Sequence, residues 1–136
     1  MSEPKVPSER YQTGMETRRS VLGNAYVDCA SAQITSFDED FQTFITESAW
    51  GAVWSRPGFT KRERSIVTIA LLAALGHYEE VAMHVRATKN TGATAEDLKE
   101  ALLHVAIYAG VPAANHAIKI IKQTLSDMVS DETATA

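Results

Sequence analysis

The segment from Thr60 to Leu75 constrains the fold more than any other part of the chain. It begins with T-K-R-E at 60–63, where the Thr hydroxyl and the Glu carboxylate can each bond the other residue's backbone N–H, a capping box. The helix that follows is apolar on all sides over residues 66–75, with Thr68 as its single polar residue. Helices without a polar face are normally buried, so we expect this one to be central and covered on every side.

Similar start and stop signals divide the rest of the chain into helices. Before residue 60 we expect a helix capped by Ser8 and ending near Gly23, a short helix over 26–33, and a helix opened by a second capping box, S-F-D-E at 36–39, followed by a loop over 53–59. After Gly76 we expect helices over about 78–90, 94–109 and 111–128, separated by Gly92 and Gly110. No segment alternates with period two, so the chain is predicted to be all-α, with six to seven helices.

The ends of the chain differ from its centre. Residues 1–7 hold two prolines, and residues 129–136 read VSDETATA. We therefore expect one helical domain over residues 8–128, with flexible termini at 1–7 and 129–136.

Composition excludes several classes of function. The formal net charge of −4 argues against a nucleic-acid-binding protein, which would carry a basic face. The start, MSEPKVPSER, lacks the apolar stretch of a secretory signal, and no apolar run is long enough to span a bilayer. The single cysteine, Cys29, excludes an intrachain disulfide and fits a reducing compartment, so we expect a cytoplasmic protein without membrane or nucleic-acid partners.

Four long stretches identify a family resemblance. They read RYQTGMETRRSVLGNAYVD, ITESAWGAVWSRPGF, RSIVTIALLAALGHYEEVAMHVRA and LLHVAIYAGVPAANHA, and together they cover about residues 10–125. In these stretches the chain resembles the carboxymuconolactone decarboxylase family. The resemblance implies an alkylhydroperoxidase D-like helical fold, a homo-oligomer (usually a hexamer) and no cofactor. It also implies decarboxylation of 4-carboxymuconolactone to 3-oxoadipate enol-lactone in protocatechuate catabolism, the β-ketoadipate pathway.

The peroxidases that share this fold use a C-x-x-C-x-x-x-H motif. On this chain its cysteine positions fall on His77 and Glu80, and its histidine falls on His84. Without the two thiols, peroxide reduction by dithiol exchange is excluded.

The substrate implied by the resemblance is a lactone with two carboxylates. One of them leaves, as CO2, a ring carbon that is conjugated through a C=C bond to the lactone carbonyl. The carbonyl can therefore accept the electron pair that CO2 leaves behind, and no cofactor is needed. The protein must stabilise the dienolate oxygen, protonate the α-carbon and anchor the other carboxylate.

His84 is the first candidate for the proton donor. It shares a helix face with Val81, Val85 and Thr88, where a core histidine bonded to a carbonyl is the ordinary alternative. The family match favours catalysis. A shared metal site is excluded, because His77 and His84 are separated by roughly 10.5 Å of helix rise. Glu80 is expected to orient His84, with a solvated side chain as the alternative.

A second row of candidates lies at i, i+4 and i+8 on the next helix: Glu100, His104 and Tyr108. His104 is an alternative proton donor, and Tyr108 could donate to a carboxylate or enolate. A buried pair without catalytic role, with Glu100 near the surface, is equally compatible with the sequence. Asn115 lies in the first turn of the last helix, whose free N–H groups could hold an anion.

For the carboxylate anchor we favour Arg56, because neighbouring Trp54 would desolvate its guanidinium. Trp54 itself is expected in the core or an interface, with a wall of the substrate site as the alternative. Arg86 is the second candidate; it points about 200° away from His84 on its helix and could act only from a neighbouring subunit. Arg18 and Arg19 are interpreted as surface charges or interface salt bridges.

Two further possibilities remain open at the level of sequence. The chain could be a non-catalytic helical oligomer that binds a small carboxylic acid or a protein partner, or a related decarboxylase of a different lactone. In each case oligomerisation is expected, because the apolar segment at 66–75, Trp50 and Trp54 offer more apolar surface than a chain of this size easily covers.

Overall fold

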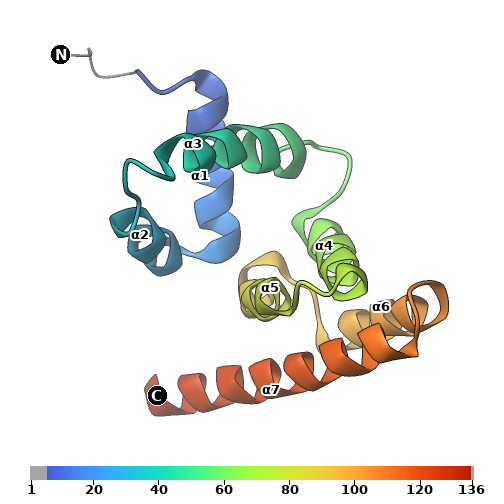
Figure 1. The fold of residues 1–136 in the computed structure, drawn as a ribbon. Helices are drawn as coiled ribbons and strands as arrows, with labels where there is room; N and C mark the ends of the chain where they lie inside the picture. The colour runs from blue at the N-terminus through green and yellow to red at the C-terminus, as the bar shows by residue number, and fades with distance from the viewer. Residues whose placement is uncertain (1–5, 136) are drawn as a thin grey trace. The chain divides into compact units, whose positions relative to one another are not determined.

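Residues 6–135 are described in a computed structural model of the protein, and they form seven α-helices and one π-helical segment (Figure 1). No strand occurs within these residues, so the all-α prediction is confirmed. The described chain falls into two compact units, which divide after Gly58. Each unit has its own packing, and the single domain expected over residues 8–128 stays a prediction.

The first unit contains α1 (Glu9–Leu22), α2 (Asn24–Ala32), α3 (Glu39–Ile45) and the π-helix η1 (Thr46–Trp54). As predicted, the Ser8 hydroxyl caps α1, accepting the N–H of Tyr11 at 3.0 Å. Helix α1 packs along η1. The two helices approach backbone to backbone at Gly14 and Gly51, where a side chain would overlap Thr46 or Arg10.

The capping box predicted at 36–39 is wrong. Asp38, not Ser36, precedes α3, and its carboxylate instead accepts the backbone N–H of Thr35 at 2.8 Å. The Asp side chain therefore stabilises a turn before the helix, and neighbouring Phe37 is 97% exposed. The loop expected over 53–59 also begins later, because the π-helix includes residues 53 and 54.

Hydroxyl groups accompany the change from α to π geometry. Thr46 donates to the carbonyl of Gln42 at 2.7 Å, and Ser55 donates to the carbonyl of Trp50 at 2.6 Å. Such back-bonding competes with regular helical hydrogen bonds. The wider turn brings two tryptophans onto one buried side, since the rings of Trp50 and Trp54 lie 5.1 Å apart and both are buried.

The second unit contains α4 (Lys61–Leu75), α5 (Tyr78–Thr91), α6 (Ala95–Tyr108) and α7 (Val111–Thr135). The capping box predicted at 60–63 is confirmed, and a further one joins Thr94 and Asp97. Gly76 and Gly92 end α4 and α5 with φ of 77° and 87°, which only glycine adopts without strain.

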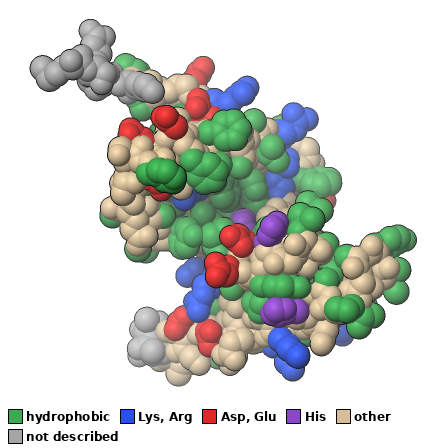
Figure 2. Space-filling model, viewed as in Figure 1, with side chains coloured by type: hydrophobic (Ala, Val, Ile, Leu, Met, Phe, Trp, Pro, Cys, Tyr) green, Lys and Arg blue, Asp and Glu red, His purple; other side chains and the backbone are tan. Residues whose placement is uncertain are grey.

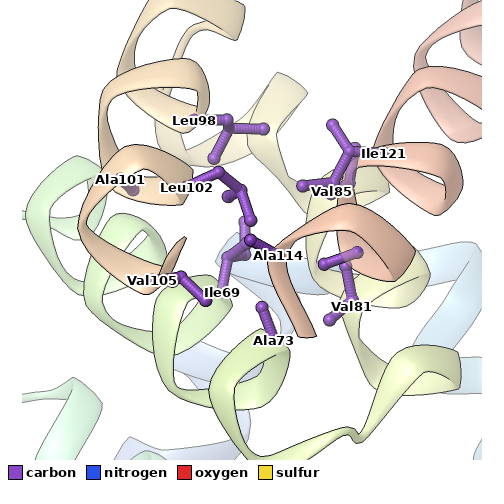
Figure 3. Packing of buried hydrophobic residues seen from close by; sticks show 11 residues of the cluster. Ile69, Ala73, Val81, Val85, Leu98, Ala101, Leu102, Val105, Ala114 and Ile121 are labelled. Carbon is purple, nitrogen blue, oxygen red and sulfur yellow. The ribbon is translucent and has the colours of Figure 1, made fainter. Parts of the chain in front are cut away.

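The core of this unit is aliphatic (Figure 3). Helices α4 and α7 each contact both α5 and α6. Side chains from all four helices meet in one cluster: Ile69, Ala73, Val81, Val85, Leu98, Ala101, Leu102, Val105, Ala114, Ala117 and Ile121. This cluster fixes α5 by its inward face, on which the candidate histidine also lies.

Two predictions for this unit are wrong. Helix α4 is not covered on every side, because Val67, Leu71 and Leu75 are 44%, 57% and 68% exposed. Spaced four residues apart, they form one apolar stripe. Helix α7 continues as helix through Thr135, beyond the end expected near residue 128, and residues 1–5 of the expected N-terminal tail lie outside the described residues. Within 6–135, no helix combines the length and hydropathy needed to cross a bilayer.

The close approach of α1 and η1 gives a test of the first unit. Gly14→Ala places a methyl group against the backbone of Thr46, and overpacking of this kind costs about 1–3 kcal/mol. Helix propensity returns at most about 1 kcal/mol. We expect a net loss of stability in urea unfolding, whereas Gly58→Ala, with nothing within 4 Å, should unfold like the parent. A Gly14→Ala protein as stable as the parent would contradict this packing.

Candidate active site

The buried face of α5 is the one predicted for it. Val81, His84, Val85 and Thr88 are all buried, and His84 is 7% exposed. All four histidines of the chain lie in the described part, and the other three are exposed. His84 is therefore the one imidazole held away from water.

Burial determines the charge of His84. It lowers the pKa of the imidazole from 6.5 to about 4, and the nearby carboxylate of Glu80 offsets only part of this effect. Near neutral pH the side chain is accordingly neutral in the protein without substrate. A histidine predicted as a proton donor thus carries no extra proton until some further negative charge approaches it.

The neighbours of His84 along α5 are exposed. Glu80 lies one turn earlier at the surface, and His77 is the residue before the first turn of the helix. Glu80 raises the pKa of His84, so it acts on the imidazole through its charge. The ring of Tyr78 packs instead on that of His116, with centroids 3.8 Å apart.

The row on α6 lies on its outer side. The rings of His104 and Tyr108 are stacked with centroids 6.5 Å apart, but both side chains are exposed, Tyr108 by 86%. The alternative of a buried pair is therefore wrong. The inward face of α6 consists of Leu98, Ala101, Leu102 and Val105. His104 lies outside this face, so the structure does not bring it into the buried region that holds His84 on α5. Asn115, in the first turn of α7, is also exposed.

The two predicted anchor arginines lie at the surface of their units. Arg56 is exposed in the loop after η1 and Trp54 is buried beside Trp50, so shielding of the guanidinium by Trp54 stays a prediction. Arg86 reaches α7, where it forms ion pairs with Asp131 at 3.1 Å and Asp127 at 3.9 Å. Its positive charge is thus already shared with two carboxylates.

A third arginine, interpreted from the sequence as a surface charge or interface salt bridge, is buried. Arg18 is only 7% exposed, its Nε has no hydrogen-bond partner among residues 6–135, and it lines a pocket in the first unit. The signal was present in the sequence, because Gly14, Arg18 and Val21 have i, i+4, i+7 spacing and all lie on the buried face of α1. Arg19 is the surface arginine, paired with Asp28 at 2.8 Å within the same chain.

Comparison with known proteins gives consistent matches. The signature of the family described as "Carboxymuconolactone decarboxylase family" matches residues 39–123. A 4-carboxymuconolactone decarboxylase of Acinetobacter baylyi is 46% identical over 120 residues, which cover 88% of this chain and 90% of that protein. A nitrosuccinic acid decarboxylase of Metarhizium robertsii is 38% identical over 88% of this chain and 83% of its own length. A 4-carboxymuconolactone decarboxylase of Pseudomonas putida is 44% identical over 43 residues, 32% of this chain and 90% of that sequence.

The lowered pKa of His84 predicts a pH-dependent stability. Below pH 6.5 the unfolded chain binds a proton at this residue that the folded protein does not bind until about pH 4, so stability falls as the pH falls through this window. The expected loss is about 3 kcal/mol, at about 1.4 kcal/mol for each pH unit.

Urea unfolding from pH 7 to pH 4 measures this loss. In the His84→Gln variant the loss of stability should be smaller by about 3 kcal/mol. The His77→Gln variant, which changes an exposed histidine, should lose as much stability as the parent. Parallel curves for His84→Gln and the parent would contradict the burial argument.

Proposed function

Because the chain belongs to the carboxymuconolactone decarboxylase family, we propose that it decarboxylates 4-carboxymuconolactone to 3-oxoadipate enol-lactone. The observation that carries this proposal is 46% identity to the Acinetobacter enzyme across 88% of the chain. The buried, uncharged imidazole of His84 supports it, because decarboxylation is favoured where a departing carboxylate is poorly solvated. This proposal places the reaction in the protocatechuate pathway and in the cytoplasm.

In the reaction, the bond between the ring carbon and the departing carboxylate breaks, and CO2 leaves. The electron pair moves through the C=C bond onto the lactone carbonyl oxygen and forms a dienolate. A proton then adds to the α-carbon, so the dianionic substrate and one proton give CO2 and a monoanionic product. No metal or organic cofactor takes part in this proposal, since the conjugated carbonyl accepts the electrons.

We assign the proton to His84. Its imidazole is neutral in the free protein, and the two negative charges of the substrate would raise its pKa and draw a proton onto it. Once the dienolate has formed, the same proton can move to carbon. Glu80 is a positioning residue in this scheme, because its carboxylate already favours the charged imidazole from one turn away.

The remaining assignments concern binding. Arg56, in the loop after η1, is the proposed anchor for the carboxylate that stays, but an exposed guanidinium holds it firmly only if a further chain covers it. Arg86 would have to leave Asp131 to serve from a neighbouring subunit. Trp54, Tyr108 and Asn115 are proposed as contacts around the lactone, and His104 is the alternative proton donor.

Apolar surface supports assembly into a homo-oligomer, for which a hexamer is proposed. The stripe Val67, Leu71 and Leu75 on α4 is exposed, and so are Leu103 and Ile107 on α6, at 57% and 79%. Figure 2 shows hydrophobic side chains at the surface over α3 as well, where Phe41 and Phe44 are exposed. A second copy of the chain would cover such surfaces, including the one beside His104.

The nitrosuccinic acid decarboxylase suggests a second candidate substrate. A nitro group, like a conjugated carbonyl, can take up the electrons that CO2 leaves behind. The family's chemistry therefore extends beyond lactones, and nitrosuccinic acid is a necessary comparison in any assay of this chain.

The direct test of function is turnover. Purified protein added to freshly made 4-carboxymuconolactone should consume the lactone absorbance and release CO2, and nitrosuccinic acid serves as the parallel substrate. Turnover of nitrosuccinic acid alone would identify the second candidate. A bound carboxylate without turnover of either compound would favour the non-catalytic binding protein.

His84 and His104 can be separated by kinetics. His84→Gln should lower kcat by roughly 10²–10⁴ with little change in KM, because proton transfer matters in the transition state. His104→Gln is the matched control and should retain kcat. A His84→Gln protein that melts early but turns over normally would make His84 a packing residue and transfer the proton to His104.

The oligomer is tested by sedimentation. The parent protein should sediment as an assembly at micromolar concentration, and Leu71→Glu, a charge in the middle of the α4 stripe, should shift it toward smaller species. Lys89→Glu, at an exposed polar position of α5, should leave the assembly intact. A parent that sediments only at 14.8 kDa would contradict assembly.

A further inference from the structure

The first unit contains a pocket of about 480 Å³, formed entirely by its own residues. Helix α1 contributes Arg18 to its wall. Neutral polar side chains from α2, the connection to α3, and α3 itself contribute half of the rest: Ser31, Thr35, Ser36, Gln42 and Thr43. Its volume falls within the range of about 300–1,000 Å³ usual for small-molecule sites.

Arg18 is the unusual member of this wall. The side chain is more than nine-tenths buried, its Nε has no hydrogen-bond partner among residues 6–135, and none of the ion pairs in this part of the chain includes it. Leaving a guanidinium buried without a partner costs several kcal/mol, so buried charges in proteins are nearly always paired. The neighbouring Arg19, by contrast, is partly exposed and bonded to Asp28 and Asn24.

The lining of the pocket selects the chemistry of the missing partner. A planar guanidinium matches the two oxygens of a carboxylate, and hydroxyl and amide groups can satisfy the remaining lone pairs. Glu39 is the one acidic residue in the lining, and it is exposed and outside any ion pair in the described chain. Its charge disfavours a ligand with more negative charges, such as a polyphosphate, and permits one with one or two carboxylates.

We propose that this pocket binds a small carboxylic acid, with the guanidinium of Arg18 holding a carboxylate. The acid has two possible sources with the same chemistry. It is either the reacting compound of the proposed function, in which case Arg18 replaces Arg56 as the anchor of the carboxylate that does not leave, or a separate free acid that occupies the first unit. Binding itself does not depend on the proposed function.

Calorimetric titration of the full-length protein with succinate tests the proposal, with dimethyl succinate as the uncharged control. Succinate should bind with saturation and the diester should not. Arg18→Met, which keeps the volume and removes the charge, should weaken succinate binding at least about tenfold, the loss expected for a charge-assisted pair of hydrogen bonds. Arg19→Met, the adjacent surface arginine, should bind as the parent does.

Two further variants distinguish the loss of a ligand contact from misfolding of the protein. Thr43→Trp fills the pocket from an exposed position and leaves Arg18 in place, so it should also abolish binding. Glu39→Gln should tighten binding, because it removes the like charge in the lining. Thermal melts accompany each titration, and Arg18→Met should melt no earlier than the parent, since it removes a buried charge without a protein partner.

The outcomes separate the proposal from its alternatives. No saturable heat with succinate, or equal affinity in the parent and Arg18→Met, would overturn it. Where turnover is present, competitive inhibition by succinate with a Ki equal to its Kd assigns the pocket to the reacting compound, and noncompetitive inhibition assigns it to a separate acid. Succinate binding that depends on Arg18 in a protein without turnover would sustain the pocket and contradict only the proposed function.

Discussion

The burial of the His84 imidazole is the constraint on which the proposed chemistry depends. His84 occupies the buried face of α5, between Val81 and Val85, whose side chains belong to the aliphatic core. Because a charged imidazole is poorly solvated there, the pKa falls to about 4 and the resting side chain is neutral. The fold thereby provides an imidazole that can accept a proton only when negative charge arrives. Binding of an anionic substrate would bring that charge.

The position of α5 follows from short-range interactions at its ends and long-range packing along its length. Left-handed glycines at 76 and 92 end α4 and α5, and capping boxes begin α4 and α6. A bidentate ion pair between Arg62 and Asp97 joins the beginnings of α4 and α6, and it lowers the pKa of the Asp97 carboxyl to about 2. Contacts with α4 and α7 then set which face of α5 is buried.

Sequence predicted the features that local rules control. Ser8, Thr60 and Gly92 mark helix ends because their side chains, or the lack of one, act on the nearest few backbone groups. The buried face of α5 was also predictable, since its apolar residues keep helical spacing. The π-helix η1, which packs closely against α1 at Gly14, was not predictable, because its wider turn leaves no distinct signal in composition.

Features that depend on neighbours were harder to predict. The apolar sequence over 66–75 indicates that other side chains should cover this helix on every face. It does not indicate whether those side chains belong to the same chain, and in a single copy the α4 stripe is exposed. His104 and Tyr108 share a face with each other, yet only tertiary structure shows that this face points outward. Arg18 was overlooked because a charged residue is assigned to the surface by default, although its spacing from Gly14 and Val21 placed it inside.

The most direct test of the central claim is a pH titration of His84, monitored by NMR of the labelled imidazoles. The signal of His84 is assigned as the one that is absent from the spectrum of His84→Gln. In the free protein the imidazole should be neutral at pH 7, with a pKa of about 4. In the presence of a saturated analogue of the lactone, which keeps both carboxylates but lacks the conjugated C=C bond and cannot lose CO2, the pKa should rise by at least about one unit. A free-protein pKa near the ordinary value, or no change when the analogue binds, would contradict the role assigned to this residue.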